Sequence, residues 1–168
     1  MTKNSKIIAV VVLSLAAIVA VLAFLNWRQM NERLEYHVEG SFRVVFGEEA
    51  FSVSIEDLIN LETNDIAPSP RGNTQYFTGV SLVNILRHLN IDYSNAEVVQ
   101  FFSIDGFATA IELDEALADG QAYIVFEEDN EALGLRDGNW ADAPFMLVMA
   151  EDPFPNRWAR YIIEIVIN

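Results

Sequence analysis

The stretch SLVNILRHLN, residues 81–90, carries the clearest helical pattern in the sequence. Its apolar residues recur at i, i+3, i+4 and i+7, which places them on one face of a helix: Leu82, Ile85, Leu86 and Leu89. Asn90 follows them, and asparagine is a residue type that ends helices. We therefore predict a helix over residues 81–89 that packs against a core, with His88 as a boundary residue and not a ligand.

Patterns typical of short strands lie on both sides of this helix. A hairpin is expected around Gly47, and Ser54 with Asp57 predicts an N-cap that starts a short helix ending near residue 61. Residues 64–73 predict a loop. Further strands are expected at 97–103, 107–113, 122–126, 145–150 and 161–167, with a short helix at 114–119. The last strand alternates so that four residues share one face: Tyr161, Ile163, Ile165 and Ile167.

Six to eight short strands with two or three short helices predict an α+β fold, a single domain built on one mixed or antiparallel sheet. Asp105-Gly106 stands between two of the expected strands. This dipeptide favours a type I′ hairpin turn, and the alternative is that Asp105 presents its carboxylate to a ligand.

The uncharged run IIAVVVLSLAAIVAVLAFL fills residues 7–25. As a helix it is roughly 28 Å long, close to the hydrocarbon thickness of a bilayer. Basic and aromatic residues flank it at interface depth: Lys3, Lys6, Trp27 and Arg28. We predict an uncleaved membrane anchor, with a signal peptide cleaved after Ala23 as the alternative.

The anchor divides the chain into four expected parts. Residues 1–6 form a short cytoplasmic tail, 7–25 a transmembrane helix, 26–37 a stalk, and 38–168 one domain. Basic residues nearly balance across the span, so the orientation rests on the amino terminus and on Glu32 and Glu35. We expect a single-pass protein of the cell membrane whose domain lies on the extracytoplasmic side.

The composition excludes several classes of protein. After residue 25 the chain holds eight Arg, no Lys and 25 Asp or Glu, a net charge of 8 − 25 = −17. Such a surface repels phosphate backbones, which excludes nucleic acid as a partner. The chain has no Cys, which removes disulfides, thiolate catalysis and Cys-ligated metals. No hydrolase, protease or nucleotide-binding motif of the usual kinds occurs.

Five phrases occur along the chain: YFTGVSLVNIL (76–86), SIDGF (103–107), YIVFEEDNEAL (123–133), PFMLVMA (144–150) and WARY (158–161). They resemble, in that order, the W-T-G-V-P-L-x-x-L-L, S-x-D-G-Y, L-A-Y-x-x-N-G-x-P-L, G-x-P-x-R-L-V-V-P and W-V-K-W phrases of the oxidoreductase molybdopterin-binding domain. The resemblance covers roughly residues 38–168 and implies a sulfite-oxidase-like fold.

The sequence departs from that family where the resemblance implies a cysteine ligand to molybdenum. Residues 66–75, before the first phrase, hold no Cys, and Arg71 is the one basic residue there for the phosphate of the pterin. We therefore expect no cofactor and no metal. Molybdopterin held without a thiolate is an alternative that the sequence does not support.

Candidate ligand-binding residues follow from the resemblance: Arg71, Tyr76, Ser103, Asp105 and Trp158. They are expected to line a cleft between the loop of residues 68–77 and the Asp105 hairpin. Arg71 is the best anion-binding candidate, and its alternative is a solvated loop arginine. No catalytic residue is assigned.

Two acidic runs carry oxygen ligands of the kind that calcium prefers: residues 127–131, and Asp137, Asn139 and Asp142. Neither follows the EF-hand order, so we predict solvated acidic faces. The last third of the chain also holds three large aromatic residues near prolines, predicted as lids on the core or as an exposed rim: Trp140, Phe154 and Trp158.

These observations predict a membrane-anchored extracytoplasmic binding module that resembles the molybdopterin-binding oxidoreductase domain without its catalysis. It would bind an unknown small molecule or protein partner, and the sequence leans against an enzyme. Two alternatives stay open. One is a molybdopterin-dependent oxidoreductase or redox-chain accessory that holds the cofactor without Cys; the other is an acidic structural envelope protein.

Overall fold

The computed structural model describes residues 3–67, 75–118, 120–134, 142–152 and 155–168. The chain forms two compact units, Met1–Tyr36 and His37–Asn168. The first unit is helix α1 (Lys3–Glu35), whose segment Ile7–Glu35 is long and apolar enough to cross a membrane. The helix continues without interruption through residues 26–35, where Arg28 donates a hydrogen bond to Glu32 one turn later at 2.9 Å.

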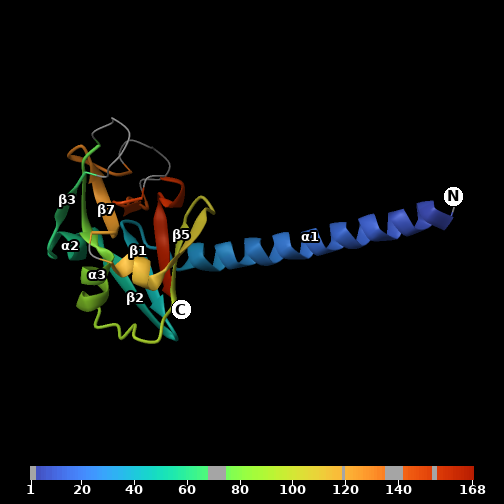
Figure 1. The fold of residues 1–168 in the computed structure, drawn as a ribbon, viewed down its shortest axis with the longest axis horizontal. Helices are drawn as coiled ribbons and strands as arrows, with labels where there is room; N and C mark the ends of the chain where they lie inside the picture. The colour runs from blue at the N-terminus through green and yellow to red at the C-terminus, as the bar shows by residue number, and fades with distance from the viewer. Residues whose placement is uncertain (1–2, 68–74, 119, 135–141, 153–154) are drawn as a thin grey trace. The chain divides into compact units, whose positions relative to one another are not determined.

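The second unit contains two five-stranded sheets among its described residues (Figure 1). Sheet A has the order β2-β1-β10-β5-β6, and β1 and β10 are parallel while every other pair is antiparallel. Its strands are β1 (Ser41–Phe46), β2 (Glu49–Ser54), β5 (Val98–Ser103), β6 (Ala108–Glu112) and β10 (Ile162–Ile167).

Sheet B has the order β3-β4-β7-β8, with β9 also paired to β7, and all of its pairs are antiparallel. Its strands are β3 (Asn64–Ile66), β4 (Phe77–Ser81), β7 (Ala122–Glu128), β8 (Glu131–Ala132) and β9 (Met146–Met149). The α+β class is confirmed, but the expected single sheet is wrong. Each strand has the same local pattern whichever sheet it joins, so the division into two sheets comes from long-range pairing.

Three short α-helices and one 3-10 turn complete the described part of the domain: α2 (Ile55–Ile59), α3 (Leu82–His88), α4 (Leu113–Leu117) and η1 (Pro155–Arg157). The predicted helix at residues 81–89 is confirmed as α3, with Ser81 as N-cap and Asn90 beyond its end at φ 54°. The capping box of α2 is also confirmed. Hydrogen bonds from Ser54 lower the pKa of the Asp57 carboxyl below its usual value.

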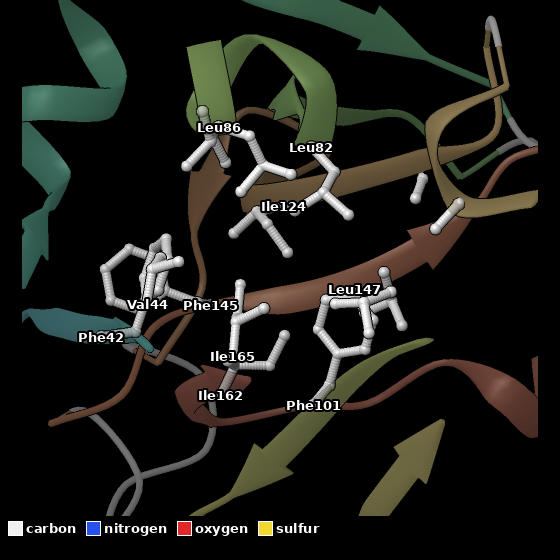
Figure 2. Packing of buried hydrophobic residues seen from close by; sticks show 14 of the residues in the cluster. Phe42, Val44, Leu82, Leu86, Phe101, Ile124, Phe145, Leu147, Ile162 and Ile165 are labelled. Atoms are coloured by element: carbon white, nitrogen blue, oxygen red, sulfur yellow. The ribbon is translucent and has the colours of Figure 1, made fainter. Parts of the chain in front are cut away.

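One main hydrophobic core draws side chains from both sheets and from all three α-helices (Figure 2). Phe42 and Phe145 meet edge to face with ring centroids 4.9 Å apart. Strand β7 alternates between this core and a second cluster. Ile124 faces the main core, whereas Val125 joins the second cluster with Phe77 and Met146. Both faces of sheet B are therefore covered by apolar side chains.

The predicted alternation of strand β10 is a second expectation that differs from the structure. The register of β10 against β5 shifts between Ile162 and Glu164, so the alternation predicted from Tyr161 onward is broken by a bulge. Ile162, Ile165 and Ile167 belong to the main core. The prediction is therefore right for Ile165 and Ile167 and wrong for Tyr161 and Ile163. The hydrophobic residues are nearly continuous there, and a period of two cannot locate a bulge within such a run.

Two loop predictions are also corrected. Residues 64–66 are strand β3 and not loop, because they pair with residues 77–79 of β4. Asp105-Gly106 does not form a type I′ turn: Gly106 has φ 89°, but Asp105 is not in the left-handed region. The loop is a three-residue connection, residues 104–106, closed by the Ser103 N–H donating to the Phe107 carbonyl at 2.9 Å. Within it the Gly106 N–H donates to the Ser103 carbonyl at 3.1 Å. A two-residue loop with both φ values positive occurs instead at Asp129-Asn130.

Gly79 generates the first prediction. A Cβ atom at this position would lie 2.5 Å from the Ile124 carbonyl oxygen and 2.6 Å from the Val125 Cα. Both are backbone atoms of the paired strand and cannot move aside without separating β4 from β7. We expect Gly79→Ala to lower the free energy of unfolding by about 3 kcal/mol, measured by urea denaturation of the full chain in detergent.

Gly47→Ala is the matched control. A Cβ at Gly47 meets nothing within 4 Å, so the only cost of the substitution is the strain of a side chain at a φ of +60°. Its cost should be about 1 kcal/mol. Equal costs at the two positions would show that the approach of β4 to β7 is not tight.

Candidate ligand site

The segment of residues 158–161, here called the linking segment, is held by backbone hydrogen bonds to both sheets. Ala159 accepts from the N–H of Leu147 in β9 at 2.8 Å, and Tyr161 accepts from the N–H of Ile104 at 2.9 Å. Tyr161 has φ 59°, a region that residues other than glycine rarely adopt. Such strain persists only where surrounding contacts enforce it, so the position of the linking segment is set by both sheets together.

Glu128 and Arg160 form a partly buried ion pair beside this segment. Glu128 is 5% exposed, and its carboxylate accepts from Gln75 Nε2 at 2.9 Å and lies 3.8 Å from an Arg160 guanidinium nitrogen. The prediction that residues 127–131 are a solvated acidic face is therefore wrong at Glu128. The turn residues Asp129 and Asn130 are exposed, as that prediction expects.

Tyr76 lies next to this pair, with its backbone held and its side chain 53% exposed. Its N–H donates to the Asp129 carboxylate at 3.0 Å, and its carbonyl accepts from the Asp129 N–H at 2.7 Å. Asp129 thus fixes the backbone just before β4. The ring of Tyr76 is left available for contact with a ligand or partner.

Trp158 is half-buried and meets Phe77 edge to face at a centroid distance of 5.8 Å. It packs against both hydrophobic clusters, so it is a lid on the core. Its indole Nε1 is buried without a hydrogen-bond partner in the described part of the chain. Trp140 and Phe154, the other aromatic residues singled out from the sequence, lie outside the described residues.

Ser103 and Asp105 share the β5–β6 hairpin but differ in environment. Ser103 is fully buried opposite Ile162, and its Oγ has no partner among the described residues. Asp105 is exposed, and its carboxylate accepts from the Phe107 N–H at 3.0 Å, which is a turn-forming bond. Arg71 lies outside the described residues.

The predicted residues thus fall into two pairs that the linking segment joins. Tyr76 precedes Phe77 in the chain, and Phe77 contacts Trp158. Ser103 pairs with Ile162, and Ile104, the residue between Ser103 and Asp105, donates to Tyr161. A cavity of about 10 Å³ beside Arg160 and Tyr161 has room for about one water molecule. The cleft expected beside residues 68–77 involves a loop that lies mostly outside the described residues.

Sequence reasoning missed four residues of this arrangement: Gln75, Glu128, Arg160 and Tyr161. Arg160 and Tyr161 belong to the WARY phrase, so their position in the sequence was available as a signal. Glu128 was hidden because it stands among exposed acids, and only the strand pairing shows that it is buried.

The described residues do not fit a molybdenum pterin. The chain has no thiolate, and no group of three or more His, Asp or Glu within the described ranges is placed to hold a metal ion. The described arginines of the domain already face carboxylates or amides: Arg43 with Glu164, Arg87 with Asn84, Arg157 with Glu115 and Asp152, and Arg160 with Glu128. A cofactor phosphate would have to displace these partners.

Two sheets around a shared core, with short helices and an apolar N-terminal helix, define a mixed α+β protein with one candidate membrane span. The solved structure of the sulfane dehydrogenase SoxCD from Paracoccus pantotrophus is similar to it, with a TM-score of 0.53 and 16% identity. The match covers 76% of this chain and 37% of that chain.

This likeness is one of fold, and it supports a molybdopterin-related fold as the five phrases predict. The chain spans little more than a third of the length of that dehydrogenase chain. No protein-family model matches the sequence, and no curated protein matches it.

Ser103 generates the second prediction, with Ser41 as its matched control. Ser103→Ala removes a buried hydroxyl without a described partner, so it should raise the free energy of unfolding by about 1 kcal/mol. Ser41 is also buried, but its Oγ donates to the Val38 carbonyl at 2.8 Å. Ser41→Ala should lower the free energy of unfolding by about 1 kcal/mol. Urea denaturation measures both, and equal losses would mean that the Ser103 hydroxyl has a partner.

Proposed function

We propose that this protein is a membrane-anchored binding module that holds a molybdopterin-related fold outside the cytoplasm and does not carry out molybdenum chemistry. Its ligand or partner binds beside the linking segment, where Tyr76, Trp158 and Arg160 lie. The observation that carries the proposal is the combination of this fold with a chain that has no Cys.

Anchoring is supported by α1. The most apolar window of its candidate span has a mean hydropathy of 3.2, and none of that window is buried inside the protein. An exposed apolar surface of this length is stable in a lipid bilayer and not in water. Basic residues nearly balance across the span, so the proposed orientation, with the domain outside the cytoplasm, rests on the amino terminus and on Glu32 and Glu35.

The loss of catalysis is supported by charge as well as by the missing thiolate. Among the described residues of the domain, Arg43, Arg157 and Arg160 are engaged with carboxylates and Arg87 with an amide. The contacts of Arg157 are the shortest of these. Glu115 lies 2.8 Å and Asp152 2.6 Å from the Arg157 guanidinium, and these contacts raise the arginine pKa. Breaking such a charge-assisted contact costs more than breaking a neutral hydrogen bond.

Binding beside the linking segment is supported by three features of one surface. Tyr76 presents an exposed ring, and Arg160 keeps 46% of its side chain exposed while it neutralises Glu128. Aromatic and arginine side chains are the types that contribute most at binding surfaces. The strained Tyr161 gives the segment a defined conformation before any ligand arrives.

The third prediction tests the cofactor. The full chain, purified in detergent from a host that makes molybdenum cofactor, should contain far less than one molybdenum per chain. It should also show no pterin fluorescence after oxidation, with a molybdopterin enzyme prepared in parallel as control. Stoichiometric metal and pterin would overturn the proposal in favour of an oxidoreductase that holds the cofactor without Cys.

The fourth prediction tests location and occupancy together, and it uses the absence of native Cys. Tyr76→Cys and Ile59→Cys each create a single thiol at positions that are 53% and 57% exposed. A membrane-impermeant maleimide should label Ile59→Cys in intact cells. Tyr76→Cys should react several-fold more slowly in cells than after purification in detergent, because the cellular ligand or partner covers it.

Two results would contradict the proposal. Labelling of both variants only after cell lysis would place the domain in the cytoplasm. The second result is that Tyr76→Cys reacts at the same rate in cells and in the purified state, while the rate of the control Ile59→Cys is also the same in both. This would show that nothing occupies this surface.

A further inference from the structure

A groove of about 310 Å³ lies at the other end of sheet B from the linking segment. Strands β4 and β7 pair Phe77 with Glu128 at one end and Ser81 with Tyr123 at the other. Four residues of strand separate these ends, a distance of about 13 Å. Ser81 and Tyr123 line the groove, together with residues of α3 and of the connection between α4 and β7. The groove is therefore a separate site from the one proposed above.

Three side-chain amides contribute to the polar lining of this groove. Asn64 at the start of β3, Asn84 in α3 and Gln121 before β7 all contribute. Asn84 accepts from the Arg87 guanidinium at 3.0 Å, but the side chains of Asn64 and Gln121 make no hydrogen bond to any described residue. Both are half-buried, so two amide groups from different elements reach the groove with their hydrogen-bonding capacity unused by the protein.

The described lining of the groove lacks the acidic excess of the rest of the domain. Its described lining holds one acid, Glu62, and one base, Arg87, whereas residues 26–168 carry a net charge of −17. Apolar side chains of Val83 and Leu117 complete the lining. The described lining thus offers no charge cluster that matches an ionic ligand of either sign. It does match an uncharged ligand with polar edges and apolar faces.

We propose that this groove binds an uncharged sugar ring, alone or within an oligosaccharide. Each amide both donates and accepts hydrogen bonds, and a sugar hydroxyl does the same, so the two match in either orientation. The C–H faces of a sugar ring would rest on Val83 and Leu117. The volume lies at the lower end of the range of about 300–1,000 Å³ that is typical of small-molecule sites.

An extended peptide is the competing occupant. It would gain affinity from backbone hydrogen bonds along an exposed strand edge. In β3, the edge strand of sheet B, only the first residue, Asn64, lines the groove. The other strand residues of the described lining, Ser81, Ala122 and Tyr123, already pair with neighbouring strands. The arrangement therefore favours the sugar.

The test, the fifth prediction, measures binding to the full chain in nanodiscs by titration calorimetry. The probes are maltotetraose, cellotetraose and chitotetraose at millimolar concentration, with tetraalanine as the peptide probe. At least one tetrasaccharide should bind. Asn64→Leu and Gln121→Leu should each weaken it about tenfold, the loss expected for one hydrogen bond. Asn95→Leu, at an exposed position outside the groove lining, should leave it unchanged.

Folding of each variant is checked by its urea midpoint, and Asn64→Asp provides a second test. Asp retains the size of Asn but loses the donor, so binding should weaken while stability holds. Binding of no tetrasaccharide, or of tetraalanine alone, would overturn the proposal. Tyr76 lies outside this groove, so the thiol-labelling experiment and this one can fail independently of each other.

Discussion

The close contact of Gly79 with the backbone of β7 is the constraint on which the rest of the domain depends. It allows β4 to pair with β7, and that pairing holds Phe77 in the second hydrophobic cluster and Ser81 at the start of α3. The two ends of this strand pair then carry the two proposed binding surfaces. A side chain larger than hydrogen at residue 79 would disturb both ends at once, since its neighbours are backbone atoms.

Charge supports the proposed binding role over molybdenum chemistry on this fold. The domain is strongly acidic, and its described arginines are engaged with carboxylates or amides that lie within or between the sheets and helices. Arg43 and Glu164, for example, face each other across β1 and β10. These cations stabilise the fold, so they are not available to an anionic cofactor without loss of stability. This engagement of the described arginines is in line with the proposal of a ligand other than an anionic cofactor.

Local features were predictable because their causes lie within a few residues. The Ser54–Asp57 capping box, the apolar stripe of α3 and its end at Asn90 all depend on neighbours in sequence. Errors arose where the cause is distant. The bulge in β10, the strand at residues 64–66 and the burial of Glu128 each depend on a partner strand more than ten residues away. The type of turn at Asp105 was also missed, because a dipeptide does not specify loop length.

The sequence by itself determined the apolar helix, the acidic character, the absence of thiol chemistry and the α+β class, because composition and short-range periodicity carry all four. Only the tertiary structure decided that the strands divide into two sheets, that Arg160 pairs with Glu128, and that Asn64 and Gln121 meet at one groove. Those outcomes depend on which distant strands pair, and strand pairing is settled by the packing of the whole core and not by any local pattern.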